Sequence, residues 1–326
     1  MLDQQKFKSF RLHLTPFSGE YYNANQETEE LEVPRACLRE AASAKAGTAR
    51  GFPAMIYHHI VPLPACRQAG TPPGGRSLRG HAPVNTVYEP RTYRNLVRTD
   101  DLVNFEVIVK ETDLFIRAKR DLSGETRESV LNYRHQLETY IFTHPEFHRS
   151  LIPVEEDPFA PEIVQDMIRA SQRTSVGPMA AVAGAVSQFV CKDLLPLSEE
   201  LIVENGGDLY LVTSKERTIG IYAGSSLLSL KIGIMVGPKD SPLGICTSSG
   251  TVGPSLSLGK ADAICILSNS ASLADAAATA VGNIVREKKD VEAGLEKARE
   301  ISQILGAVII VDDKVGAWGD LNLVRL

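Results

Sequence analysis

The chain has 326 residues, of which 43% are hydrophobic and 23% charged, and its formal net charge is −5. This composition is ordinary for a globular protein with a full core, and the acidic balance argues against general nucleic-acid binding, which needs a basic face. The five cysteines form no CxxC pair and are expected to be reduced thiols, which excludes a disulfide framework and a cysteine zinc site.

Residues 1–87 differ in composition from the rest. Between Ala41 and Tyr88 there is no acidic residue, and prolines alternate with glycines. Such a stretch sustains neither a helical nor a strand period, so we predict a disordered N-terminal extension, or a start codon assigned too far upstream. The opening residues carry charges without a continuous apolar run, so no signal peptide is expected there, and no later run is expected to reach transmembrane length. A cytoplasmic protein is therefore expected.

Residues 88–326 are predicted to form a single domain. Apolar and polar residues alternate over 104–111, as in a half-buried strand, and a second strand is predicted over 113–120 after a very short gap. The two segments predict a hairpin.

Two helices are expected next. Ser123 is expected to cap the first, which runs to about Thr143 and ends at Pro145. The second is predicted to start at Pro161, because proline is favoured at the first helical position, and to run to about Arg173.

The segment SVGPMAAVAGAVSQFV, residues 175–190, is predicted to be a loop that turns into a helix of small residues. Backbone N–H groups at such a helix start can face an anion. Gly177 and Ala180, at the start of this helix, are candidate ligand-binding residues.

The segment ELIVENGGDLYLV, residues 200–212, predicts a strand, a turn and a strand. The hairpin alone would explain the two glycines, but it does not explain the polar residues that crowd around them. Polar groups at strand ends beside bare backbone favour a binding site. The candidate residues are Glu204, Asn205, Gly206, Gly207 and Asp208. Short strands are predicted at 218–222 and 231–236.

A loop rich in glycine and small hydroxyl residues follows residue 244. It offers N–H and O–H donors without bulk, as phosphate binding requires. It is not a Walker loop, because Ala261 stands where Ser or Thr should be, and no GxGxxG follows a strand, so a Rossmann site is not expected. The candidate phosphate-binding residues are Ser248, Ser249, Gly250 and Thr251.

A helix is predicted over 270–283, with Ser270 or Ser272 as its cap. Its surface is almost entirely alanine, apart from Asp275 and Thr279, which lie four residues apart on one face. A carboxylate and a hydroxyl in this arrangement suit Mg2+. The alternative is a tightly packed helix whose aspartate favours the positive end of its own dipole.

The C-terminal part is expected to contain a helix capped by Asp290 and a terminal hairpin of 307–313 and 314–318. Every histidine precedes Arg149, so the region with the candidate site has no imidazole for a catalytic triad. Chemistry there would depend on carboxylates, hydroxyls, backbone N–H groups and a metal ion.

Four segments occur in an order that resembles the ApbE superfamily of FAD:protein FMN transferases: GPMAAVAG (177–184), ENGGD (204–208), CTSSGTVG (246–253) and ADAAATA (274–280). The resemblance spans about residues 88–324. It implies an α+β fold of layered, mostly antiparallel sheets with flanking helices.

The resemblance also implies FAD binding, Mg2+ held by Asp275 and Thr279, and transfer of FMN to a hydroxyl of a target protein. A backbone carbonyl near Ala180 would assist the metal. Residues 206–208 would border the flavin nucleotide, and residues 248–251 would contact its phosphates.

Two features depart from the family pattern. The first glycine-rich segment lacks the lysine of the transferases, and TVGPSLSLGK (251–260) lacks their histidine. Three functions are therefore expected as alternatives: FMN transfer or FAD hydrolysis, flavin or nucleotide binding without turnover, and a structural or assembly role with degenerate motifs.

Overall fold

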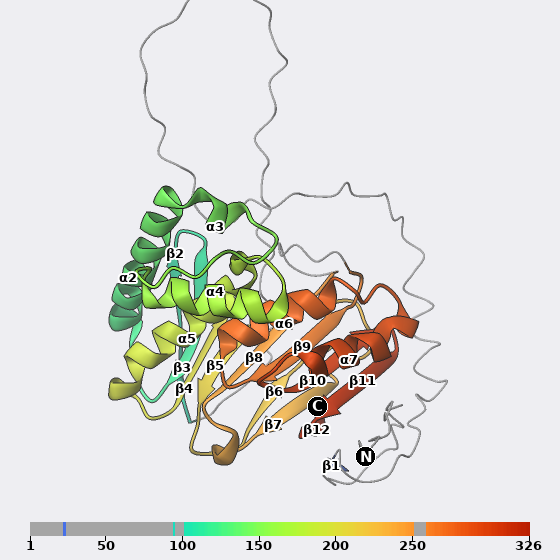
Figure 1. Cartoon of the computed structure of the whole chain (residues 1–326). Helices are drawn as coiled ribbons and strands as arrows, with labels where there is room; N and C mark the ends of the chain where they lie inside the picture. The colour runs from blue at the N-terminus through green and yellow to red at the C-terminus, as the bar shows by residue number, and fades with distance from the viewer. Residues whose placement is uncertain (1–21, 24–93, 95–100, 251–258) are drawn as a thin grey trace, which may run out of the picture.

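The structure is a computed structural model that describes residues 22–23, 94, 101–250 and 259–326 (Figure 1). Within the predicted N-terminal extension it describes only Tyr22–Asn23, which form strand β1 and pair with a strand near the C-terminus. The rest of that prediction lies outside the described residues.

An antiparallel sheet of eight strands forms the middle layer, with the order β11-β10-β9-β8-β5-β4-β3-β2. The hairpins predicted over 104–120 and 200–212 are present as β2–β3 and β4–β5 and are neighbours in it. The predicted α+β class with layered antiparallel sheets is confirmed. The strands are β2 (Val103–Val109), β3 (Thr112–Ala118), β4 (Leu201–Asn205), β5 (Asp208–Val212), β8 (Leu243–Ser248), β9 (Ala263–Ser268), β10 (Ile304–Val311) and β11 (Lys314–Gly319).

A smaller antiparallel sheet has the order β1-β12-β7-β6. Its strands β6 (Arg217–Gly220), β7 (Ile232–Val236) and β12 (Asn322–Arg325) pack against the large sheet. The strand predicted at 218–222 is shifted by one to two residues. The hairpin β10–β11 is present, but it does not close the chain, because β12 follows it and joins the other sheet.

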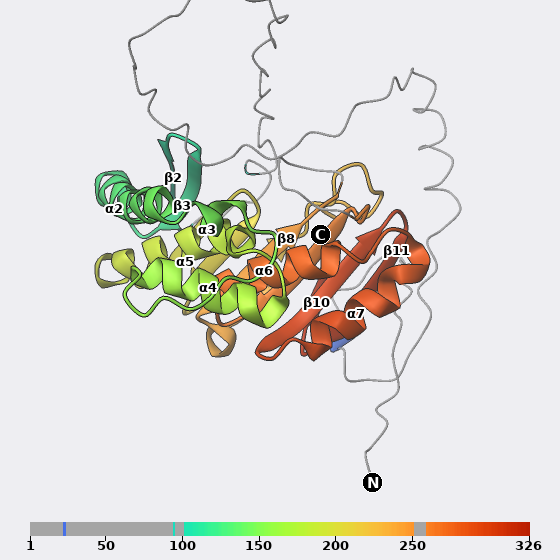
Figure 2. The same cartoon turned by 45° about the horizontal axis from the view of Figure 1, so that its top comes forward.

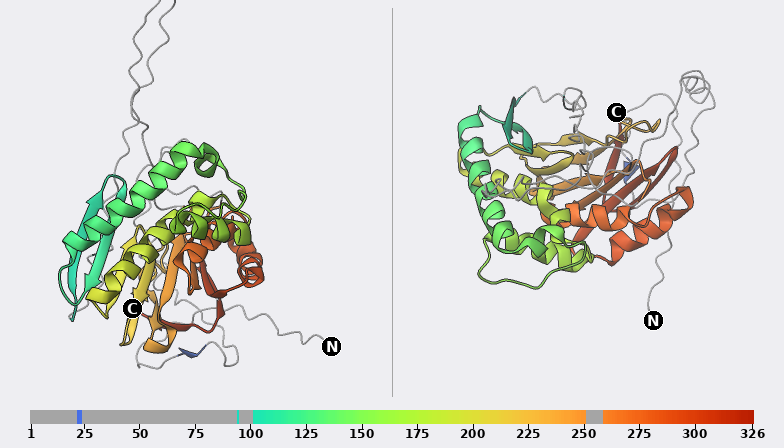
Figure 3. Two further views of the ribbon diagram at one scale, coloured as in Figure 1. Left: turned by 60° about the vertical axis from the view of Figure 1, so that its left-hand side comes forward. Right: turned by 90° about the horizontal axis from the view of Figure 1, so that it is seen from above.

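Helices cover the opposite face of the large sheet, with α4, α5 and α6 side by side (Figure 2). The turquoise hairpin β2–β3 forms one edge of the sheet, and α2 packs beside it (Figure 3). The helices are α2 (Ser123–Thr143), α3 (Pro145–Arg149), α4 (Glu162–Thr174), α5 (Val182–Leu194), α6 (Ala271–Gly282) and α7 (Val291–Glu300), with short 3-10 turns η2 (Pro178–Ala181), η3 (Leu195–Leu197), η4 (Pro238–Asp240) and η5 (Lys288–Asp290).

The core therefore has two parts, one on each face of the large sheet. In β9, Ile264 and Ile266 belong to the cluster under the helices, whereas Cys265 and Leu267 belong to the cluster under the small sheet. Because both faces are covered, the strand is apolar from Ala263 to Leu267 and does not alternate. Cys191 and Cys265 are both fully buried in this core.

The predicted helix caps have mixed outcomes. Ser270 caps α6, because its hydroxyl accepts the N–H of Leu273 at 3.3 Å. The prediction for Ser123 is wrong: it lies inside α2, and its N–H donates to Asp121 at 2.8 Å. Asp290 precedes α7, but its carboxylate accepts the N–H groups of Arg286 and Glu287 instead of capping that helix.

One segment, Pro178–Leu197, is long and apolar enough to cross a membrane by length and composition alone. The expectation that no run reaches this length is therefore wrong. The segment comprises η2, α5 and η3, and 56% of its most apolar window is buried inside the fold. Contacts with α4, α6 and the sheet explain its apolar composition.

Candidate functional site

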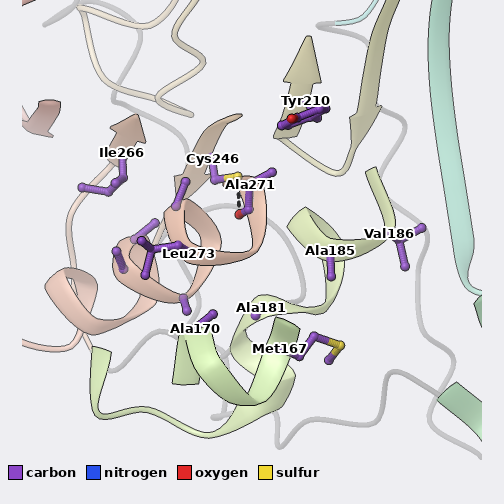
Figure 4. Packing of buried hydrophobic residues seen from close by; sticks show 14 of the residues in the cluster. Met167, Ala170, Ala181, Ala185, Val186, Tyr210, Cys246, Ile266, Ala271 and Leu273 are labelled. Carbon is purple, nitrogen blue, oxygen red and sulfur yellow. Dashed lines mark hydrogen bonds between the residues drawn. The ribbon is translucent and has the colours of Figure 1, made fainter. Parts of the chain in front are cut away.

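Helix α6 lies at the centre of the helical layer, in contact with β8, β9, α4 and α5. Small residues on both elements allow α6 to approach β8 closely. A Cβ on Gly244 of β8 would lie only 2.6 Å from the Cα of Ala271 of α6. Figure 4 shows Ala271 facing Cys246 of β8, with the Cys246 thiol donating to the Ala271 carbonyl at 3.3 Å. The packing interpretation is therefore correct for the alanines. Within α6, Asp275 and Thr279 are half-buried and all other residues are buried.

Asp275 points at the first turn of another helix, α5. Its Oδ2 accepts the N–H of Gly184 at 2.9 Å, and the carboxylate also accepts the N–H of Ala183. The first N–H groups of a helix have no partner within it, and no side chain at the α5 N-cap, Ala181, supplies one. Asp275 therefore caps α5 from 91 residues away. It does not lie in the first turn of its own helix, so the dipole interpretation is wrong.

Asp208 lies close enough to Asp275 for their charges to interact. It is the first residue of β5, and it pairs in register with Cys246 of β8. Burial raises the pKa of Asp208 well above its ordinary value, and the charge of Asp275 raises it further. Burial also raises the pKa of Asp275, to about 7, although hydrogen bonds from Gly184 and Ala183 oppose the shift. Two neighbouring carboxylates that are hard to ionise together favour a bound proton or cation between them.

The turn between β4 and β5 has the geometry that its sequence predicts. Gly206 and Gly207 have φ values of 70° and 104°, in the left-handed region that two-residue hairpin turns require. Asn205 donates from Nδ2 to the carbonyl of Ala183 at 3.2 Å, so the turn is tied to the start of α5. Glu204 accepts the N–H of Gly207 at 2.7 Å through Oε1.

Gly177 and Ala180 lie at η2, immediately before α5. A Cβ on Gly177 would lie 1.9 Å from the carbonyl oxygen of Ser150, so backbone packing against the α3–α4 connection explains this glycine. Ala180 donates its N–H to the carbonyl of Gly177 at 3.1 Å and is half-buried.

The glycine and serine loop begins at the end of β8. Ser248 is the last residue of that strand, two positions beyond Cys246, and Gly250 donates its N–H to Ala261 at 2.9 Å. Thr251 lies outside the described residues. The fold thus brings together four segments that are far apart in the sequence, which we call the Asp275 cluster. It comprises Asp275 of α6 with Thr279 one turn further along, Ala183 and Gly184 of α5, the turn 204–208, and Cys246 and Thr247 of β8, which the loop residues 248–250 follow in the chain.

A buried polar network behind the Asp275 cluster was not foreseen from the sequence. Asp166 of α4 accepts hydrogen bonds from Ser272 of α6 at 2.5 Å and from Gln188 of α5 at 3.2 Å. Gln188 in turn accepts the N–H of Ala271 at 2.7 Å. The network fixes α4, α5 and α6 relative to one another. Asp166 and Gln188 lie in the middle of their helices, and nothing in the sequence around them indicates that they contact each other.

The residues around Asp275 fit a magnesium ion. Among the described residues there is no group of three or more His, Cys, Asp or Glu side chains that could hold a metal. Mg2+ does not need such a cage, because it binds through one or two carboxylates and completes its shell with water and phosphate oxygens. Thr279 is half-buried and lies one turn from Asp275 on the same face of α6, which places its hydroxyl beside that carboxylate.

We expect the stability of the metal-free protein to fall as the pH rises from about 4 to about 7, the interval between the unfolded-state and folded-state pKa values of Asp275. The folded-state pKa of Asp275, about 7, exceeds its ordinary value of 3.8, so the folded protein binds this proton more tightly than the unfolded chain does. Each such group removes up to about 1.4 kcal/mol of stability per pH unit within that window, and Asp208 shifts in the same direction. Thermal unfolding across this pH range measures the slope. Asp275→Asn should flatten it, and an equal slope in both proteins would contradict the assignment.

A family model with the description "AbpE bacteria" matches residues 94–315. A UPF0280 protein of Methanosarcina barkeri is 41% identical over 216 residues, covering 65% of this chain and 85% of the relative. A UPF0280 protein of Methanocaldococcus jannaschii is 40% identical over 221 residues, covering 66% of this chain and 90% of the relative.

Two solved structures are also similar. The flavin transferase ApbE from Vibrio cholerae aligns with a TM-score of 0.45 at 14% identity, covering 67% of this chain and 96% of that structure. The apo form of the Pseudomonas stutzeri flavinyl transferase ApbE aligns with a TM-score of 0.44 at 13% identity, covering 67% and 94% of the respective chains.

Proposed function

Because this chain belongs to the AbpE bacteria family, as its match over residues 94–315 shows, we propose that it binds a flavin dinucleotide together with Mg2+ at the Asp275 cluster. The observation that carries this proposal is the pairing of Asp275 with Asp208. Two carboxylates from distant segments lie together where burial opposes their charge, and a cation would stabilise both.

Each part of the cluster has a role in the proposal. Asp275 and Thr279 would hold Mg2+, assisted by a backbone carbonyl near Ala180. The turn at Gly206 and Gly207 would border the flavin nucleotide without side-chain bulk. The diphosphate would lie against the donors of the loop at the end of β8, where Ser248, Ser249 and Gly250 are described. The cation would supply neutralisation of the diphosphate charge.

FMN transfer is the reaction that this arrangement supports. An acceptor hydroxyl would form a bond to the flavin-side phosphorus of FAD, the bond to the AMP phosphate would break, and the hydroxyl proton would be released. With water as the acceptor, the products would be FMN and AMP. The protein would contribute in-line positioning and hydrogen-bond donors.

Binding without turnover is the second candidate, and a specific observation favours it. The described histidines, His135, His144 and His148, all lie on α2, on α3 or between them, and the segment 177–184 has no lysine. Neither group is therefore available at the Asp275 cluster in the positions that the transferase resemblance implies.

Incubation of the purified protein with FAD and Mg2+, followed by chromatography for AMP, separates these candidates. AMP above the level of an Asp275→Asn control supports turnover, and mass spectrometry of an added flavoprotein would detect transferred FMN. A rise in melting temperature with FAD and Mg2+ but no AMP supports binding alone. If neither FAD nor FMN stabilises the protein and no AMP forms, the proposal fails and a structural role with degenerate motifs is favoured.

The proposal includes a cytoplasmic location. The described cysteines, Cys191, Cys246 and Cys265, are buried free thiols. Free thiols are expected in a reducing compartment.

A further inference from the structure

Two buried arginine–carboxylate clusters hold the β4–β5 hairpin, one at each end. At the turn end, Glu204 binds Arg94, which also binds Asp113 and Glu106; we call this the Arg94 cluster. At the opposite end, Glu200 binds Arg217, which also binds Asp101; we call this the Arg217 cluster.

Arg94 is bound through almost all of its donors. Its Nε donates to Glu204 at 2.6 Å, and one terminal nitrogen donates to Asp113 at 2.7 Å and to Glu106 at 2.8 Å. The other terminal nitrogen donates to the carbonyl of Asp113 at 3.0 Å. Burial alone would lower the pKa of Arg94, but Glu204 and Asp113 outweigh it and raise the pKa. A planar, permanently charged guanidinium satisfies this geometry and a lysine ammonium does not.

Glu204 connects Arg94 to the turn of the candidate site. Its Oε2 accepts from Arg94, while its Oε1 accepts the N–H of Gly207. Asp208 follows Gly207 directly and is the residue that interacts with Asp275. With both oxygens of Glu204 engaged, the side chain is placed to fix the turn and not to contact a ligand.

We propose that Arg94 is a positioning residue for ligand binding: through Glu204 it fixes the Gly206–Gly207 turn and therefore the place of Asp208 opposite Asp275. The expected effect of Arg94 on flavin binding rests on the proposed function, whereas its expected effect on the geometry of the turn does not. It gives a functional role to a residue that precedes the first strand of the large sheet and lies 110 positions from Glu204.

The Arg217 cluster provides a matched control on the same hairpin. Arg217 donates to Glu200 at 3.0 Å and to Asp101 at 2.6 Å, and its side chain is 9% exposed, compared with 5% for Arg94. Glu200 accepts the N–H of Ser214 at 2.8 Å, as Glu204 accepts that of Gly207. Both substitutions, Arg94→Lys and Arg217→Lys, therefore loosen a similar cluster, but only the first adjoins the Asp275 cluster.

Amide hydrogen exchange on the full chain tests whether Arg94 fixes the Gly206–Gly207 turn. Arg94→Lys is expected to speed exchange at Gly207 by about tenfold, equal to about 1.4 kcal/mol, and to leave Ser214 unchanged. Arg217→Lys is expected to do the reverse. If Gly207 keeps its protection in Arg94→Lys, or loses it equally in Arg217→Lys, the inference is overturned.

Titration with FAD and Mg2+ tests whether the position of the turn affects ligand binding. Arg94→Lys is expected to raise the Kd by about tenfold, whereas Arg217→Lys should leave it unchanged at a similar loss of melting temperature. An unchanged Kd in Arg94→Lys overturns the role in ligand binding. If the unsubstituted protein binds no FAD, the proposed function fails, and the exchange result still decides whether Arg94 positions the turn.

A second variant covers the case in which Arg94→Lys does not fold. In Glu204→Gln, the amide oxygen can still accept the N–H of Gly207, but the charge that holds Arg94 is lost. Faster exchange at Gly207 with unchanged Ser214 is the expected result, and unchanged exchange at both residues overturns the inference.

Discussion

Replacing Asp275 by asparagine is expected to abolish Mg2+-dependent FAD binding while the fold stays intact. The amide keeps an oxygen that accepts the N–H of Gly184, so the start of α5 remains capped. The substitution removes the anionic oxygen that a magnesium ion requires. We expect the Kd for FAD in Mg2+ to rise by on the order of a hundredfold, or about 2.7 kcal/mol. Isothermal titration with and without Mg2+ measures this change.

Asp275→Ala separates the cap from the metal site. Alanine removes the acceptor as well as the charge, so the N–H groups of Ala183 and Gly184 lose their side-chain partner, at a cost of about 1–3 kcal/mol. We expect both variants to lose binding, but only the alanine variant to lose stability. If the asparagine variant binds FAD with Mg2+ as tightly as the unsubstituted protein does, Asp275 is only a helix cap.

Replacing Gly184 by alanine is expected to destabilise the fold by about 3 kcal/mol or more. The new Cβ would lie 2.2 Å from the carbonyl oxygen of Ala271 and 2.9 Å from the Cβ of Asp275. Because the first contact is with backbone, α5 and α6 would have to separate, and overpacking in a core costs about 1–3 kcal/mol or more. The separation would also stretch the hydrogen bond from Gly184 to Asp275. Thermal unfolding should show a fall in Tm of roughly 6–12 °C.

Gly124→Ala is the matched control for this prediction. Gly124 lies in α2, and a Cβ there would meet no atom within 4 Å. Alanine is favoured over glycine in helices by up to about 1 kcal/mol, so this variant should match or exceed the unsubstituted protein in Tm. If both glycine variants unfold at the same temperature, α5 and α6 do not cross as closely as the structure shows.

Local sequence was sufficient to predict several elements. The two glycines at 206–207 predicted a tight hairpin turn, and both have the positive φ that such a turn needs. The run of small residues after Ser270 predicted α6, with Ser270 or Ser272 as its cap, and the structure shows that Ser270 is the cap. These features depend on residues within a few positions of one another, so short-range patterns contain the information.

Two other predictions failed, one because of a neighbouring residue in the sequence and one because of a tertiary contact. Ser123 has the side chain of a helix cap, but it is the first residue of α2, and the carboxylate of Asp121, two positions earlier, accepts its N–H. The strand β12 was not foreseen, because its four residues belong to a sheet assembled from segments far apart in the sequence.

The order of residues alone is enough to single out Asp275 and Thr279 among the alanines of α6, and to predict a turn at Gly206 and Gly207 beside acidic residues. The packed fold was needed to show that Asp275 reaches the start of α5, interacts with Asp208, and lies beside a turn that Arg94 holds. The difference arises from distance along the chain. These contacts join residues 91 and 110 positions apart, and such contacts depend on how the sheet and helices pack, not on any local period.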